Sequence, residues 1–222
     1  MSHKLEVDSV IKFLNNNLIL SDIYFCCETS DIISIFGRNG SGKSTLFKII
    51  FGTINSENKS VMINNEKLNY FTFSKNNINY LPQNTFIPKY FTVKKSISYF
   101  LKETDYKVFC EDEIIKSIIT KKISNLSFGE LRYLEVKLVL CSKSKFSILD
   151  EPFQGLSPIL IKRLKDLIRD TRKYKGIIIT DHNYIDVLEI TNKIYLLKDG
   201  RIVKLQNPEE LIKNGYLKSL LY

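Results

Sequence analysis

A glycine-rich segment constrains the fold of this chain more than any other part of its sequence. The pattern G-x-x-x-x-G-K-[ST] is matched by Gly37-Arg38-Asn39-Gly40-Ser41-Gly42-Lys43-Ser44. The apolar run 32–36 before it predicts a buried strand, and residues 45–51, followed by Gly52, predict a helix. A strand, a glycine loop and a helix in this order form a phosphate cradle, because backbone N–H groups and the helix N-terminus converge on one point.

The cradle suggests a role for each of its residues. Lys43 can reach the β- and γ-phosphates of a nucleotide, and Ser44 can ligate Mg²⁺. We therefore expect the phosphates to be bound by Gly37, Asn39, Gly40, Ser41, Gly42, Lys43, Ser44 and Thr45.

A second segment supplies acids. The apolar run Phe146–Leu149 ends in Asp150 and Glu151, which predicts a buried strand that delivers two carboxylates to its C-terminal end. Open α/β sheets bind their ligands at that edge. Asp150 would hold Mg²⁺, directly or through water, and Glu151 would orient or deprotonate the attacking water.

In their order along the chain, these segments resemble the nucleotide-binding domain of ABC ATPases, and the resemblance covers nearly the whole chain. The family signature, usually Leu-Ser-Gly-Gly followed by Gln or Glu, falls on residues 126–130 (Leu-Ser-Phe-Gly-Glu). The Q-loop glutamine falls on Gln83 and the switch histidine on His182. The adenine-stacking aromatic falls on Phe13, for which a core position is the alternative.

The resemblance implies an α/β fold, a P-loop NTPase of the ABC type. Its RecA-like mixed sheet core would be joined by an N-terminal antiparallel β region and an inserted α-helical subdomain. It also implies one domain over residues 1–222, with a catalytic core at about 1–83 and 142–222. The helical subdomain, at about 84–141, would carry the signature and is short for the family.

The resemblance also implies how the site works. Ser127 and the amides of the following helix, including that of Gly129, would face the γ-phosphate held by a second ATPase subunit. Gln83 would sense both metal and water, and it joins Ser44 and Asp150 as a metal residue. His182 would contact the γ-phosphate and hold the attacking water in line for Glu151.

Two positions depart from the family pattern. Phe128 replaces a glycine of the signature, where a ring could crowd the partner's phosphate or change the loop geometry. Ser157 stands where the family usually carries an aspartate of the dimer contact, which puts the coupling of the two sites in doubt. These departures are compatible with slow ATP hydrolysis by this chain, or with its pairing with a second ATPase subunit that has the usual family motifs.

The function implied is that of an ATP-hydrolysing transporter subunit. Two such subunits, identical or different, would close around two ATP molecules with Mg²⁺ and drive a substrate through transmembrane permease subunits. Segments 150–158 and 180–183 are most similar to the ATPases of lipopolysaccharide export and of branched-chain amino-acid import. The alternatives are a soluble ABC ATPase of assembly, repair or translation, and a slow ATP-dependent clamp.

Composition bears on the partners. The net charge is +9, but the basic residues are spread along the chain, so a solvated surface is favoured over anionic lipid, and nucleic acid comes last. No C-x-x-C pair occurs among the four cysteines, which argues against a zinc or disulfide framework. No apolar run reaches the ~18 residues that a membrane helix needs, and the N-terminus lacks a signal-peptide layout. We expect a cytoplasmic location, peripheral on the cytoplasmic face of the cell membrane.

Local patterns predict the remaining elements. Short strands are expected at 18–20, 23–25, 60–63 and 176–180, and Asp199-Gly200 predicts the turn of a hairpin over 194–203. Helical spacing predicts helices at 92–101 and 160–168, one that begins at 111–113 and a last one that begins near 208–210.

Overall fold

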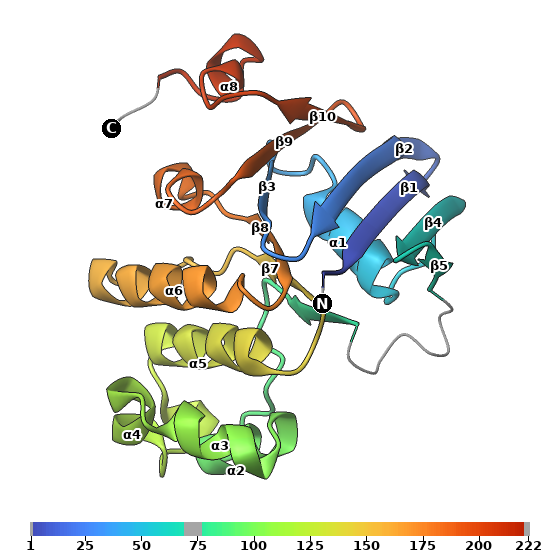
Figure 1. Ribbon diagram of the computed structural model, residues 1–222. Coiled ribbons are helices and arrows are strands. Elements are labelled where there is room, and N and C mark those ends of the chain that lie inside the picture. The colour runs from blue at the N-terminus through green and yellow to red at the C-terminus, as the bar shows by residue number, and fades with distance from the viewer. Residues whose placement is uncertain (1, 69–76, 220–222) are drawn as a thin grey trace.

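The computed structural model describes residues 2–68 and 77–219, whose strands form two sheets (Figure 1). The first is antiparallel, with the order β2-β1-β4-β5, and the second has the order β10-β9-β3-β8-β7-β6. The strands are β1 Lys4–Leu14, β2 Asn17–Glu28, β3 Ile32–Phe36, β4 Asn58–Ile63, β5 Glu66–Lys67, β6 Ile78–Leu81, β7 Phe146–Asp150, β8 Gly176–Thr180, β9 Lys193–Lys198 and β10 Arg201–Leu205.

The six-stranded sheet brings the motif-bearing segments of the sequence to one edge. All its neighbouring strands are parallel except β9 and β10, which form a hairpin. Asp150, the last residue of β7, pairs with Thr180, the last residue of β8. The carboxyl ends of β3, β7 and β8 therefore meet at the same edge, where the loops that follow them can share one site.

Helices cover both faces of this sheet. Helix α1 lies between the two sheets, α5 and α6 cover the opposite face, and α2, α3 and α4 gather at the end of the molecule away from β9 and β10 (Figure 1). The helices are α1 Lys43–Phe51, α2 Val93–Phe100, α3 Glu103–Cys110, α4 Glu113–Ile118, α5 Phe128–Cys141, α6 Pro158–Thr171, α7 Tyr184–Leu188 and α8 Glu210–Lys213, with a 3-10 turn η1 at Ile123–Asn125.

The central strands are buried on both faces, so their sequences are apolar without interruption. Their side chains alternate between two core clusters. In β3, Ile32 and Phe36 face α5 and α6, whereas Ile33 and Ile35 face α1 and the antiparallel sheet. This two-sided burial fixes the register of β3 and hence the direction in which the glycine loop leaves the sheet.

The predicted fold class is confirmed: a mixed sheet is joined by an antiparallel sheet and by helices inserted between β6 and β7. The hairpin turn is confirmed as well, because Asp199 and Gly200 both have positive φ, at 51° and 75°. The prediction of separate strands at 18–20 and 23–25 was wrong. Both belong to β2, a single strand that continues through an irregular residue at Asp22, where φ is 53°.

The sequence patterns predict no strand at β1, although β1 lies between β2 and β4 within the antiparallel sheet. Its apolar alternation is broken at Ser9, where φ is 53° and the register with β2 shifts between Val7 and Val10. An interrupted period-2 pattern gives a weak strand signal, which explains the omission.

A partly buried carboxylate joins α4 to α5. Asp112 caps the N-terminus of α4 by accepting hydrogen bonds from the N–H groups of Ile114 (2.9 Å) and Ile115 (3.2 Å). Its other oxygen accepts from the Tyr133 hydroxyl at 2.6 Å and from Lys137 Nζ at 2.7 Å. Burial alone would raise the pKa of Asp112, but the hydrogen bonds from Lys137, Tyr133 and Ile115 together hold it below its ordinary value.

We predict that Asp112→Ala lowers the free energy of unfolding by about 2–3 kcal/mol near neutral pH, because it removes hydrogen bonds to a charged group. A carboxylate with a lowered folded-state pKa stabilises the fold above its unfolded pKa, near ~3.9, and this stabilisation is lost as the pH falls through the folded-state value. Denaturant titrations of both proteins from neutral to acidic pH should therefore converge. A gap that stays constant down to the acid limit would contradict this role for Asp112.

Candidate functional site

The glycine loop leaves the carboxyl end of β3 and enters α1 at Lys43. Gly42 has φ of 101°, and a Cβ atom there would lie 2.9 Å from Cγ2 of Ile19, so both the backbone conformation and the space require glycine. Lys43 Nζ donates to the carbonyl oxygens of Gly37 at 2.6 Å and Arg38 at 3.1 Å. The lysine thus lies along the loop with its charge at the cradle, where it can meet a phosphate.

Lys43 is electrostatically linked to the acids at the end of β7. Burial lowers the pKa of Lys43, and the negative charges of Asp150 and Glu151 oppose that change. Lys43 and the two carboxylates therefore lie close together in a partly buried region, where charges interact more strongly than in water.

Asp150 is 1% exposed, and its two oxygens have different surroundings. Oδ2 accepts a hydrogen bond from the Tyr80 hydroxyl at 3.1 Å, whereas Oδ1 has no hydrogen-bond partner among the described residues. Burial raises the pKa of Asp150, and the hydroxyl groups of Ser44 and Tyr80 oppose the rise. An unpaired buried carboxylate oxygen beside a serine hydroxyl suits a hard divalent cation such as Mg²⁺.

Glu151 lies among residues from two other loops. Its Oε2 accepts a hydrogen bond from Gln83 Nε2 at 3.0 Å, and its Oε1 is 3.1 Å from His182 Nε2. Gln83 follows β6 and His182 follows β8, so three neighbouring strand ends supply this group. A carboxylate held between an amide and an imidazole can accept a proton from a bound water.

The backbone of Glu151 is strained. Its φ is 54°, in the left-handed region that non-glycine residues seldom occupy and that costs about 1–3 kcal/mol. The N–H of Glu151 donates to the carbonyl of Thr180 at 2.8 Å, which ties the turn to β8. Strain of this kind persists where surrounding contacts over-determine it, and it is concentrated at functional sites.

One cavity of about 410 Å³ unites most of the predicted site residues. Within the described chain it is lined by Leu14, Ile19, Asn39, Gly40, Ser41, Gly42, Lys43, Ser44, Thr45, Gln83, Glu151 and His182. Asp150 lies buried next to this group through its link to Ser44, and Gly37 is joined to it by the hydrogen bond from Lys43. The cradle, Glu151 and His182 therefore face the same space.

Phe13, the predicted adenine platform, is not among the residues that line this cavity. Its neighbour Leu14 lines the cavity together with Ile19, because successive side chains of a strand point to opposite faces. Phe13 is 41% exposed at the end of β1, so it is not a core residue either. An aliphatic surface thus stands where an aromatic ring was expected.

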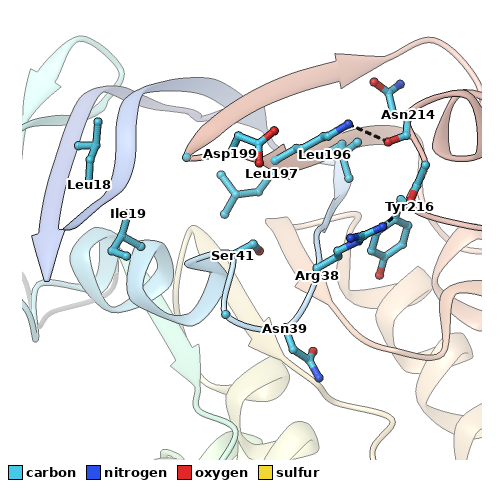
Figure 2. Close-up of a pocket in the computed structure, with 14 residues that line it drawn as sticks. Leu18, Ile19, Arg38, Asn39, Ser41, Leu196, Leu197, Asp199, Asn214 and Tyr216 are labelled. Carbon is cyan, nitrogen blue, oxygen red and sulfur yellow. Dashed lines mark hydrogen bonds between the residues drawn. The ribbon is translucent and has the colours of Figure 1, made fainter.

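A second cavity, of about 500 Å³, lies on the outer side of the glycine loop (Figure 2). It shares Ile19, Asn39, Gly40 and Ser41 with the first but includes none of Lys43, Gln83, Glu151 and His182. Its outer wall is the β9–β10 hairpin and residues 214–216, where Arg38 Nη2 donates to the Gly215 carbonyl at 3.2 Å and Lys198 Nζ to the Asn214 carbonyl at 3.1 Å. The cavity of about 410 Å³ is therefore the candidate site. The β9–β10 hairpin and residues 214–216 support the glycine loop from its other side.

The signature residues lie outside both cavities. Ser127 is the N-cap of α5, in a capping box in which its Oγ accepts from Glu130 N at 3.2 Å and its N–H donates to Glu130 Oε2 at 2.8 Å. A Cβ at Gly129 would lie 3.5 Å from Cδ1 of Leu160 and 3.7 Å from the Gly155 carbonyl oxygen. The 58%-exposed ring of Phe128 lies so close to Gly155 that a Cβ on Gly155 would be 2.5 Å from it. The structure of one chain thus does not bring Ser127 and Gly129 to the cradle.

Sequence reasoning missed three contributors: Tyr80, Leu14 and Arg38. Tyr80 was visible as the residue three before Gln83, on a strand parallel to β7, but its contact with Asp150 depends on the pairing of β6 with β7. Leu14 and Arg38 depend on long-range packing, for which the sequence offers no local signal.

Comparisons with known proteins agree with this geometry. A family model described as "ABC transporter" matches residues 20–154. The lipopolysaccharide export system ATP-binding protein LptB of Haemophilus influenzae is 27% identical over 228 residues, which cover 96% of this chain and 95% of that protein. A probable ABC transporter ATP-binding protein of Azorhizobium caulinodans is 26% identical over 215 residues, covering 91% and 76% of the two chains.

The fold has solved counterparts. The structure of an ATP-binding subunit of an ABC transporter matches with a TM-score of 0.84 and 21% identity over 96% of this chain and 93% of that chain. No helix within residues 2–68 and 77–219 has the length and apolar character needed to cross a membrane.

We predict that Leu14→Tyr tightens binding of a fluorescent ATP analogue roughly fivefold, because a ring added at the cavity wall gains about 1 kcal/mol by stacking on the base. Phe13→Ser is the matched control on the adjacent residue, and its affinity should stay within about twofold of the original, as for a surface substitution. Equilibrium titration measures both. Weakened binding in Phe13→Ser, with no change in Leu14→Tyr, would show that Phe13 and not Leu14 contacts the adenine base.

Proposed function

This chain belongs to the ABC transporter family, and from that premise we propose that it is a transporter ATPase whose catalytic group is Glu151 with Gln83 and His182. The observation that carries the proposal is the meeting of these three side chains with Lys43 and Ser44 around one cavity. We further propose that residues 1–222 act as one ATPase domain, with a core at about 1–83 and 142–222 and a helical subdomain at about 84–141.

In this proposal different residues of the chain bind the phosphates, activate the water and contact the base of ATP. The glycine loop from Gly37 to Thr45 binds the phosphates through backbone N–H groups, and Lys43 neutralises their charge. Glu151 takes a proton from the attacking water at a carboxylate oxygen, and His182 holds the terminal phosphate and the water in line. Leu14 and Ile19 provide the apolar wall for the base.

Mg²⁺ would be held by Ser44, Asp150 and Gln83. The free Oδ1 of Asp150 and the Ser44 hydroxyl suit it, and the Gln83 amide has its oxygen left after Nε2 donates to Glu151. When bound, the cation supplies charge neutralisation between the terminal phosphates.

The signature residues act, in this proposal, on the nucleotide of a second ATPase subunit. Ser127 and Gly129 begin the long helix α5, whose N-terminal amides attract anions, and they lie away from the cradle of their own chain. The Ser127 oxygen already accepts from Glu130 N, which leaves its hydroxyl hydrogen to donate to a phosphate. ATP then joins two subunits, and its hydrolysis releases them.

A slow ATP-dependent clamp is the second candidate function, favoured by Phe128 and Ser157. The Phe128 ring covers Gly155, and the Ser157 hydroxyl accepts from Leu160 N as the N-cap of α6 at 3.5 Å. Both side chains are thereby engaged within their own chain. Steady-state phosphate release by the unmodified protein separates a transporter ATPase, which turns over, from a clamp, which does not.

We predict that Glu151→Gln slows ATP hydrolysis on the order of 10²–10⁴-fold, because the amide cannot accept the proton of water. ATP binding should persist, and size exclusion in saturating ATP should show a dimer. Lys43→Ala is the control, since it should lose tight binding and elute as a monomer under the same conditions. Undiminished turnover in Glu151→Gln, or a monomer in saturating ATP, would overturn the proposal.

Membrane subunits are the proposed partners, at the cytoplasmic face of the membrane, and no nucleic acid is required. The relatives are ATP-binding proteins of transport systems. The segment after Gln83 exposes Tyr90 (77%) and Tyr99 (76%), each in an edge contact with a neighbouring ring. Such aromatic residues are enriched at protein interfaces, so a partner could bind this segment, which follows Gln83 in the chain.

We predict that Tyr90→Ser combined with Tyr99→Ser lowers the fraction of the protein that sediments with native membranes by more than about half, since aromatic anchors dominate interface energies. Tyr174→Ser, a 78%-exposed tyrosine elsewhere on the surface, should change nothing. Phosphate release by the purified variants should equal that of the original protein. Equal sedimentation of all three proteins would contradict the docking surface.

A further inference from the structure

Arg132 is a buried cation in α5 that no step of the proposed reaction uses. The residue is 2% exposed and comes two residues after the signature. Its guanidinium donates to three backbone carbonyls: Nη1 to Pro82 at 2.8 Å, and Nη2 to Asp150 at 2.5 Å and to Glu151 at 3.0 Å. Pro82 directly precedes Gln83, so a single side chain contacts the segments that carry Gln83, Asp150 and Glu151.

Glu135 completes this contact from the same face of α5. Its Oε2 lies 3.5 Å from Arg132 Nη1, and its Oε1 accepts from the Thr85 hydroxyl at 2.5 Å and from the N–H of Phe86 at 3.0 Å. The carboxylate is almost fully buried as well. The segment around Gln83 is therefore fastened to α5 on both sides, by Arg132 before it and by Glu135 after it.

The same bonds account for the strained backbone of Glu151. Its N–H is held by Thr180 and its carbonyl by Arg132, so both polar groups of the residue have partners. The preceding carbonyl, that of Asp150, is held by Arg132 too. A left-handed non-glycine residue needs such fixed neighbours to persist.

We propose that Arg132 is a positioning residue that sets the geometry of Glu151 and Gln83 from the helix that begins at the signature. The inference rests on the proposed function, in which Glu151 is the base. Buried ion pairs are seldom retained for stability alone, because apolar residues of similar volume are often as good. A planar fork of donors aimed at three carbonyls instead fixes the relative place of three segments. A movement of α5 is then transmitted to Glu151.

The test compares variants of the full chain by steady-state kcat, KM for ATP and unfolding temperature. Arg132→Lys keeps the charge but presents one compact head group, which cannot bridge both segments. We expect kcat to fall about 10–100-fold, as for a catalytic group displaced by ~1 Å. KM for ATP should change less than about threefold, since nucleotide binding is untouched. Lys137→Met is the matched control, because it removes another buried cation of α5, paired with Asp112.

The control should lower the unfolding temperature and leave kcat unchanged, so that loss of stability and loss of positioning are separated. A wild-type kcat in Arg132→Lys, or equal losses of kcat in Arg132→Lys and Lys137→Met, would overturn the inference. If Arg132→Lys does not fold, Glu135→Gln carries the test, with the same fall in kcat at constant KM expected at smaller size. Glu151→Gln distinguishes the two levels: full activity there refutes the proposed function, whereas its loss beside an unaffected Arg132→Lys refutes only the positioning role.

Discussion

Two adjacent carboxyl groups buried at the edge of a sheet are the constraint on which this structure depends. Asp150 and Glu151 are both less than a tenth exposed, and burying charge without partners is costly. Each neighbouring segment therefore contributes a polar partner: Tyr80 from β6, Gln83 from the following loop and His182 after β8. Among the described residues Oδ1 of Asp150 has no such partner, which leaves it available to the metal that we propose.

The two sheets make this arrangement possible. The parallel strands β3, β7 and β8 bring three loops to one edge, and burial on both faces keeps their register. The antiparallel sheet reaches the same site, since Ile19 of β2 touches Gly42 and lines both cavities. From behind, residues 214–216 support the loop through Arg38. The cradle thus depends on segments from both ends of the chain.

Contiguous patterns explain what could be predicted from the sequence. The cradle, the acids after 146–149 and the turn at Asp199-Gly200 are local, because dihedral preferences and apolar runs determine them. The positions of Leu14 and Phe13 depend instead on the exact phase of an irregular strand, and a shift of one residue reverses the face. In the sequence, Arg132 is one of two basic residues of α5, and nothing local distinguishes it from Lys137. Its contacts with Pro82 and Glu151 exist only after α5 packs on the sheet.

The left-handed backbone of Glu151 affects how the sequence can change in evolution. Glycine or asparagine would occupy that conformation with less strain, so folding alone favours replacing the proposed base. Only a continuing demand for turnover keeps glutamate there. A descendant that no longer needed to consume ATP would be expected to lose this residue early, while its glycine loop and sheets persisted.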